Sequence, residues 1–182
     1  MKWTLSNQLT VGRVLLIPLF IIAFYFIPKP FNHYTASLLF VLASITDWLD
    51  GYLARSRGEV TAFGRFLDPV ADKLLVASAL VMLVEQQLVP STLAIIIIGR
   101  EITIGALREW LAEHATIVHV SMLAKWKTAA QMIAITGLIL HVDCFGLPVH
   151  QISIVALWLA AVLTLWSAYE YLRDAWPELK ER

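Results

Sequence analysis

A succession of six apolar runs, each close to the length of a membrane-spanning helix, is the strongest constraint on how this chain can fold. A helix of about 20 apolar residues crosses the roughly 30 Å hydrocarbon core of a bilayer. The connections are short, and the longest polar stretch, residues 55–65, leaves no room for a soluble domain. The six expected helices cover residues 9–27, 34–53, 66–89, 91–111, 120–141 and 149–172.

The composition agrees with this interpretation. Hydrophobic residues make up 59% of the 182 residues, charged residues make up 15%, and the mean hydropathy is +0.71. Soluble domains contain about 45–50% apolar and about 25% charged residues, so a soluble globular protein is excluded. The sequence therefore predicts an all-α polytopic membrane protein with six transmembrane helices in a single domain over residues 1–182. Residues 1–9, which mix polar and apolar positions, form either a short interfacial segment or the plain start of the first helix.

Charge and cysteine content exclude other classes of protein. The 14 Lys and Arg residues balance the 14 Asp and Glu residues, so no net positive charge is available to attract nucleic acid. The single cysteine, Cys144, allows neither an intramolecular disulfide nor a thiolate metal site. We therefore expect no nucleic-acid partner and no thiol chemistry.

The placement of the basic residues predicts the orientation. Thirteen of the 14 lie on the amino-terminal side of the predicted bundle, and Lys29 alone lies on the other. Without Arg13, Lys73 and Arg100, which fall near or inside the runs, the ratio is still ten to one. Because cytoplasmic flanks collect Lys and Arg, both termini are expected in the cytoplasm.

Four carboxylates within or beside the apolar runs are the main candidates for chemistry, since charged residues at membrane depth are rare and usually functional. Asp47 and Asp50 are three residues apart, and Asp68 and Asp72 are four apart, so each pair shares one face of its helix. Two helices joined by a short link can bring all four together, where they repel one another unless a cation neutralises them. An all-oxygen set without His or Cys suits Mg²⁺ or Mn²⁺.

Small and basic residues accompany these carboxylates. Gly51, Ala54 and Gly64 either open the backbone for a bulky ligand or serve helix packing, which is the commoner use of small residues in membranes. Arg55 either pairs with a ligand phosphate through its guanidinium or anchors its helix on the positive side.

Pro69 leaves two possibilities for the third helix. A helix that begins at Gly64 or earlier contains Pro69 and is kinked by it. A helix that begins at Pro69 is capped by Asp68, because the residue before a proline favours an extended conformation.

The combined pattern D-x2-D-G-x2-A-R-x8-G-x3-D-x3-D resembles the signature of the CDP-alcohol phosphatidyltransferase family. The six-run layout extends the resemblance over the whole chain. Residues 7–13, 99–101 and 125–128 carry a weaker similarity to bacterial members that use glycerol 3-phosphate. The eight positions of the pattern fall within 26 residues: Asp47, Asp50, Gly51, Ala54, Arg55, Gly64, Asp68 and Asp72.

The resemblance implies an enzyme that replaces CMP in a CDP-linked lipid by an alcohol, within a six-helix bundle that is commonly a homodimer. It implies that Asp47, Asp50 and Asp68 ligate metal and that Asp72 is both a ligand of a second ion and the general base. Two Mg²⁺ or Mn²⁺ ions are expected. The residues implied to lie against the CDP moiety are Asn7, Thr10, Gly51, Ala54, Arg55 and Gly64.

The implied substrates are the membrane lipid CDP-diacylglycerol and sn-glycerol 3-phosphate, and the implied products are phosphatidylglycerophosphate and CMP. The acceptor phosphate needs basic side chains, for which Arg100, Arg108, Lys125 and Lys127 are the candidates. Arg100 can instead form an interhelical salt bridge, and the two lysines can be interfacial anchors. From the residues alone, inositol phosphate or serine stays open as the acceptor.

The implied location is a bacterial-type inner membrane with both termini and the active site facing the cytoplasm. Carboxylates and divalent ions suit direct in-line displacement with inversion at phosphorus. A carboxylate-lined ion transporter is the competing class. It is disfavoured because residues 74–84 beyond Asp72 contain only Ser78 as a polar side chain. A structural protein with a buried charge network would not require eight positions at fixed spacing.

Overall fold

The computed structural model describes residues 4–57, 61–113, 122–141 and 148–180 of the chain. Within these ranges the protein consists of helices and contains no strand, so the predicted all-α class is confirmed for them. The side chains of Ala54, Arg55, Lys125 and Lys127 lie outside the described part of the structure. The helices are α1 (Leu5–Phe26), α2 (Phe31–Arg57), α3 (Ala62–Glu85), α4 (Ser91–Glu113), α5 (Met122–Leu140) and α6 (Val149–Lys180).

Every predicted run corresponds to one helix, but several ends differ. The Thr4 side chain caps α1 by accepting a hydrogen bond from the Asn7 amide, as helix-capping threonines do. Residues 5–9 are therefore the first turns of α1, which favours the plain helix start. The predicted end of the third helix at residue 89 is wrong. Gln87 takes a positive φ of 59°, and the Leu88 amide bonds back to the Leu83 carbonyl, which ends α3 at Glu85.

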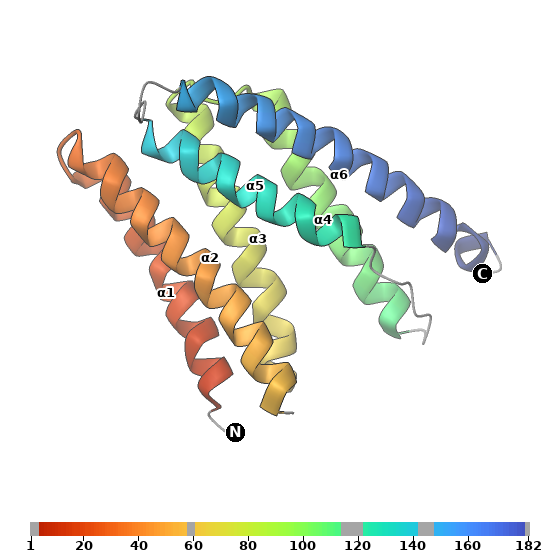
Figure 1. The fold of residues 1–182 in the computed structure, drawn as a ribbon. Coiled ribbons are helices and arrows are strands. Elements are labelled where there is room, and N and C mark those ends of the chain that lie inside the picture. Colours follow the sequence, from red (N-terminus) through yellow and green to blue (C-terminus); the bar gives the residue numbers. More distant parts are fainter. Residues whose placement is uncertain (1–3, 58–60, 114–121, 142–147, 181–182) are drawn as a thin grey trace.

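Successive helices run in alternating directions (Figure 1). α1 packs mainly on α2, and α5 packs mainly on α6, while α3 contacts α1, α2, α4 and α5. At one end of the bundle the Tyr25 hydroxyl donates to Glu85, and His33 Nδ1 lies 3.0 Å from the Ile139 carbonyl oxygen. The first contact links the end of α1 to the end of α3, and the second links the start of α2 to the end of α5. The carboxylate-bearing ends of α2 and α3 lie at the opposite end.

Apolar side chains fill the interior and also cover the outside. Phe20 and Phe40 pack with ring centroids 6.0 Å apart in a core that continues through Leu80 and Leu138. Large apolar side chains are exposed as well, among them most of the outward face of α6. Such continuous apolar surface indicates an apolar environment around the helices. Among the described residues, two helical stretches are long and apolar enough to cross a membrane, Asn7–Phe26 and Val149–Trp176.

Candidate active site

A polar stripe on α1 organises the carboxylate end of the bundle. Asn7, Thr10 and Arg13 follow one another at three-residue spacing and are almost completely buried. Residues three apart lie on one face of a helix, so this face of an otherwise apolar helix is turned inward, toward α2 and α3. The stripe contacts both helices that carry the Asp motif.

Arg13 bridges the two carboxylates of α2. Its Nη1 atom lies 2.5 Å from Asp47 Oδ1, and its Nη2 atom donates to Asp50 Oδ2. The Arg13 side chain is 0% exposed, Asp50 is 2% exposed, and Asp47 is 40% exposed. The prediction from sequence did not include Arg13 among the site residues. The sequence did contain a sign of this role, because an arginine inside an apolar run needs a partner for its charge.

Thr10 connects the carboxylate of α2 to that of α3. Its hydroxyl oxygen lies 2.7 Å from Asp68 Oδ1 and 3.2 Å from Asp50 Oδ2. One hydroxyl group is thus within hydrogen-bond distance of carboxylate oxygens from two different helices. The structure therefore brings Asp47, Asp50 and Asp68 together around Arg13 and Thr10.

Asn7 fixes the start of α3. The Thr61 hydroxyl donates to Asn7 Oδ1 over 2.7 Å, and the same oxygen of Thr61 accepts from the Gly64 amide at 3.0 Å. A Cβ at Gly64 would lie 3.3 Å from both Asn7 Oδ1 and Thr61 Oγ1 and 3.6 Å from Asp68 Oδ2. The absence of a side chain at position 64 therefore lets the first turn of α3 approach α1 beside Asp68.

α3 continues from Ala62 through Pro69 without ending. The alternative in which the third helix begins at Pro69 and Asp68 caps it is wrong, because Thr61 provides the cap seven residues before Asp68. Asp68 and Asp72 therefore lie one turn apart within the same helix. Gly51 is half-buried in α2, next to Asp50.

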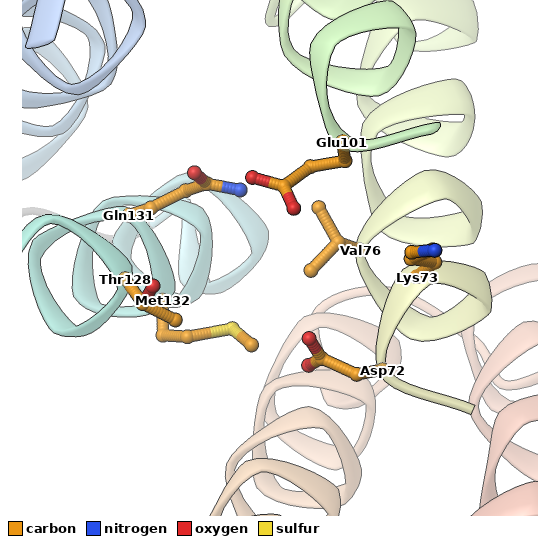
Figure 2. Close-up of a pocket in the computed structure, with 7 residues that line it drawn as sticks. All are labelled: Asp72, Lys73, Val76, Glu101, Thr128, Gln131 and Met132. Atoms are coloured by element: carbon orange, nitrogen blue, oxygen red, sulfur yellow. The ribbon is translucent and has the colours of Figure 1, made fainter. Parts of the chain in front are cut away.

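Asp72 lines a pocket on the side of α3 that meets α4 and α5. The pocket is small and partly open to the surroundings, and it lies between α3, α4 and α5. Figure 2 shows the Asp72 carboxylate pointing into this space. Its lining residues are Asp72, Lys73, Val76, Glu101, Thr128, Gln131 and Met132.

Among the residues whose side chains the structure describes, Lys73 is the basic one that lines this pocket, and the prediction from sequence did not assign it to the site. Its Nζ atom lies 3.9 Å from Glu109 Oε1 on α4. The side chain passes directly over Gly105, where a Cβ would collide with Nζ. In the sequence, the position of Lys73 directly after Asp72 was the one indication that it belongs to the site. Where its ammonium lies depends on how α3 is rotated against α4, which only the structure shows.

The two arginines of α4 contact α6. Arg100 donates to Glu101 Oε1 at 2.8 Å and to Ser167 Oγ at 2.9 Å. The interhelical salt bridge considered for Arg100 is therefore an ion pair within α4, and the bond between helices goes to a serine. The Arg108 guanidinium carbon lies 5.8 Å from the centre of the Tyr171 ring.

The chemistry of the donors in this region fits a hard divalent cation, because carboxylate oxygens from two helices converge and hard cations prefer oxygen ligands. In the part of the chain that the structure describes, no three His, Cys, Asp or Glu side chains are arranged to hold a metal ion. Among the described side chains, Arg13 forms an ion pair with both Asp47 and Asp50.

Comparisons with known proteins give consistent matches. A family model for CDP-alcohol phosphatidyltransferase matches residues 3–166. A Pseudomonas fluorescens protein is 49% identical, with 97% of this chain and 92% of the relative covered, and a Haemophilus influenzae protein is 47% identical, with 96% and 95% covered. A Bacillus subtilis protein is 41% identical with 98% of each covered. All three are named CDP-diacylglycerol–glycerol-3-phosphate 3-phosphatidyltransferase.

Proposed function

The chain belongs to the CDP-alcohol phosphatidyltransferase family, and on this basis we propose that it transfers the phosphatidyl group of CDP-diacylglycerol to sn-glycerol 3-phosphate. The products are phosphatidylglycerophosphate and CMP. The observation that carries this proposal is the convergence of the motif carboxylates Asp50 and Asp68 on Thr10, one turn away from the pocket that Asp72 faces.

Asp47, Asp50 and Asp68 are the proposed ligands of a divalent cation, and Asp72 is the proposed ligand of a second one. Mg²⁺ or Mn²⁺ suits these oxygen donors. Such ions, when bound, neutralise the pyrophosphate and the charge that develops on the leaving CMP. Within the protein, Arg13 and Thr10 hold the carboxylates of α2 and α3 against one another.

The CDP moiety is proposed to lie against Gly51, Ala54, Arg55 and Gly64. Asn7 and Thr10 are proposed to act on it indirectly. Both are buried, and their polar atoms contact Thr61 and the motif carboxylates. They therefore support the groups that meet the substrate.

Asp72 is the proposed general base, because its carboxylate points into the pocket where an alcohol can enter (Figure 2). It accepts the proton of the C1 hydroxyl as that oxygen attacks the lipid-proximal phosphorus. The new phosphorus–oxygen bond forms as the bond to CMP breaks, and the electron pair leaves with CMP. A direct displacement inverts the configuration at phosphorus.

The phosphate of the acceptor is proposed to lie among basic residues around this pocket. Arg100 precedes Glu101, which lines the pocket, and position 127 precedes Thr128, which also lines it. Lys73 adds a positive charge from α3. The full proposed set is Arg100, Arg108, Lys125, Lys127 and Lys73.

We also propose that all six helices span a bacterial inner membrane, with the carboxylate site and both termini in the cytoplasm. The alternating directions of the helices (Figure 1) and the concentration of basic residues toward one side support this topology. A single domain over residues 1–182 and a homodimer complete the proposal.

The test uses purified protein in detergent with CDP-diacylglycerol and Mg²⁺, and separate labelled glycerol 3-phosphate, serine, inositol and inositol phosphate. CMP release and labelled lipid are measured together, with D72N as the control. The proposal requires labelled lipid from glycerol 3-phosphate alone, its loss in EDTA and its recovery with Mg²⁺ or Mn²⁺. Turnover with another alcohol refutes the acceptor, and absence of CMP with every acceptor refutes the enzyme class and makes ion transport the next function to test.

A further inference from the structure

The pocket beside Asp72 contains polar side chains beyond the one carboxylate that the proposed general base supplies. Glu101 enters it from α4 and Gln131 from α5. Gln131 is only 4% exposed, and a buried amide is costly unless it has a hydrogen-bonding task. Figure 2 shows the amide end of Gln131 and the carboxylate of Glu101 pointing toward one another, with Asp72 on the remaining side of the space. Val76 and Met132 supply apolar lining.

The Glu101 carboxylate is held in place by the neighbouring Arg100 guanidinium. Arg100 donates to Glu101 Oε1 at 2.8 Å, and a second nitrogen of the same guanidinium donates to Ser167 Oγ at 2.9 Å. Because Ser167 belongs to α6, the Glu101 side chain is tied to two helices while it reaches a pocket formed by α3, α4 and α5. A carboxylate held in this way is suited to discriminating ligands by geometry.

We propose that Glu101 and Gln131 recognise the secondary hydroxyl of the acceptor and are specificity-determining residues. This inference rests on the proposed function. Transfer consumes the C1 hydroxyl of glycerol 3-phosphate, and C3 carries the phosphate, so the C2 hydroxyl remains to be bound. A hydroxyl both donates and accepts hydrogen bonds. The Glu101 carboxylate accepts its proton, and the Gln131 amide donates to its oxygen, which places the C1 hydroxyl on the side of Asp72.

The experiment compares two acceptors, sn-glycerol 3-phosphate and 3-hydroxypropyl phosphate, which has the same attacking hydroxyl and phosphate but no secondary hydroxyl. A site built to bond a hydroxyl strongly rejects an analogue that lacks it, because the polar groups of the site lose their partner. We expect the wild-type protein to prefer glycerol 3-phosphate by about 100-fold or more in kcat/KM.

The decisive variants are Q131L and E101Q. Q131L is expected to lower kcat/KM for glycerol 3-phosphate by about 10- to 100-fold and to leave that for 3-hydroxypropyl phosphate within about threefold, because only the first acceptor uses the lost bond. E101Q keeps the shape but weakens the acceptor group, so its preference is expected to fall between wild type and Q131L. Q151L, which removes an exposed glutamine at the start of α6, is the matched control and should keep the wild-type ratio.

The outcomes distinguish the recognition role of Gln131 from the proposed transferase activity. If wild type and Q131L show the same preference between the two acceptors, the recognition role is refuted while the proposed function stands. If that unchanged preference comes with an equal loss of kcat/KM for both acceptors, Gln131 has only a structural role. If the wild-type protein releases no CMP with either acceptor, the proposed function fails, and this assignment fails with it.

Discussion

Replacing Arg13 tests whether the α1 stripe holds the carboxylate site together. In R13Q the Asp50 carboxylate, 2% exposed, loses its ion-pair partner in a buried position. Removal of one member of a buried pair costs about 3–5 kcal/mol of the free energy of unfolding, because the remaining charge stays desolvated. Asp47 is 40% exposed, so its pair with Arg13 is screened and contributes only about 0–1 kcal/mol. The expected loss in R13Q is therefore about 3–5 kcal/mol, nearly all of it from Asp50.

The assay is reversible unfolding in mixed detergent micelles with EDTA present, so that divalent ions cannot replace the lost charge. R173Q is the matched control, since it removes an arginine whose pair with Asp174 is exposed on both sides, at 63% and 54%. This control should lose at most about 1 kcal/mol. R13K keeps the charge without the forked geometry and should lie between the two variants. A loss in R13Q no larger than that of R173Q would show that Arg13 does not stabilise the buried Asp50 carboxylate.

Three further changes test the site and its packing. D72N should lower kcat by about 10²- to 10⁴-fold with an unchanged unfolding transition, because it removes the general base; CMP release near the wild-type rate would exclude that role. G105A places a Cβ against Lys73 Nζ, so the ammonium must move, and steady-state kinetics should show a severalfold higher KM for glycerol 3-phosphate at nearly constant kcat; an unchanged KM would remove Lys73 from the acceptor site. G64V overpacks the contact with Thr61 and should lower the free energy of unfolding by about 1–3 kcal/mol, measured by denaturant unfolding. An unfolding free energy equal to that of the wild type would show that α3 can shift freely at this contact.

Local pattern was enough to predict much of this protein. The helices followed from the length of the apolar runs, and the pairing of Asp47 with Asp50 and of Asp68 with Asp72 followed from helical spacing. Helix ends were less predictable. α3 ends at Glu85 because Gln87 adopts a left-handed φ. The polar residues 85–87 interrupt the apolar run before Leu88 and Val89, but polar residues also occur inside helices, so they did not fix the end.

The neighbours of the motif required the tertiary structure. Hydrophobic pattern indicated that α1 is buried on some face, but not that its polar stripe meets α2 and α3, so the partners of Arg13 and Thr10 could not be assigned. Similarly, the sequence offered four basic residues for the acceptor, yet Lys73 lines the pocket while Arg100 and Arg108 contact α6.

Residue types and their spacing along the chain were enough to predict the helices of the described residues, the faces that carry the carboxylates and the family, because none of these depends on how the helices pack. The tertiary structure alone decided which cation neutralises Asp50 and which side chains surround Asp72. Those contacts depend on how far each helix is rotated and shifted against its neighbours, and that is set by packing among residues far apart in the chain.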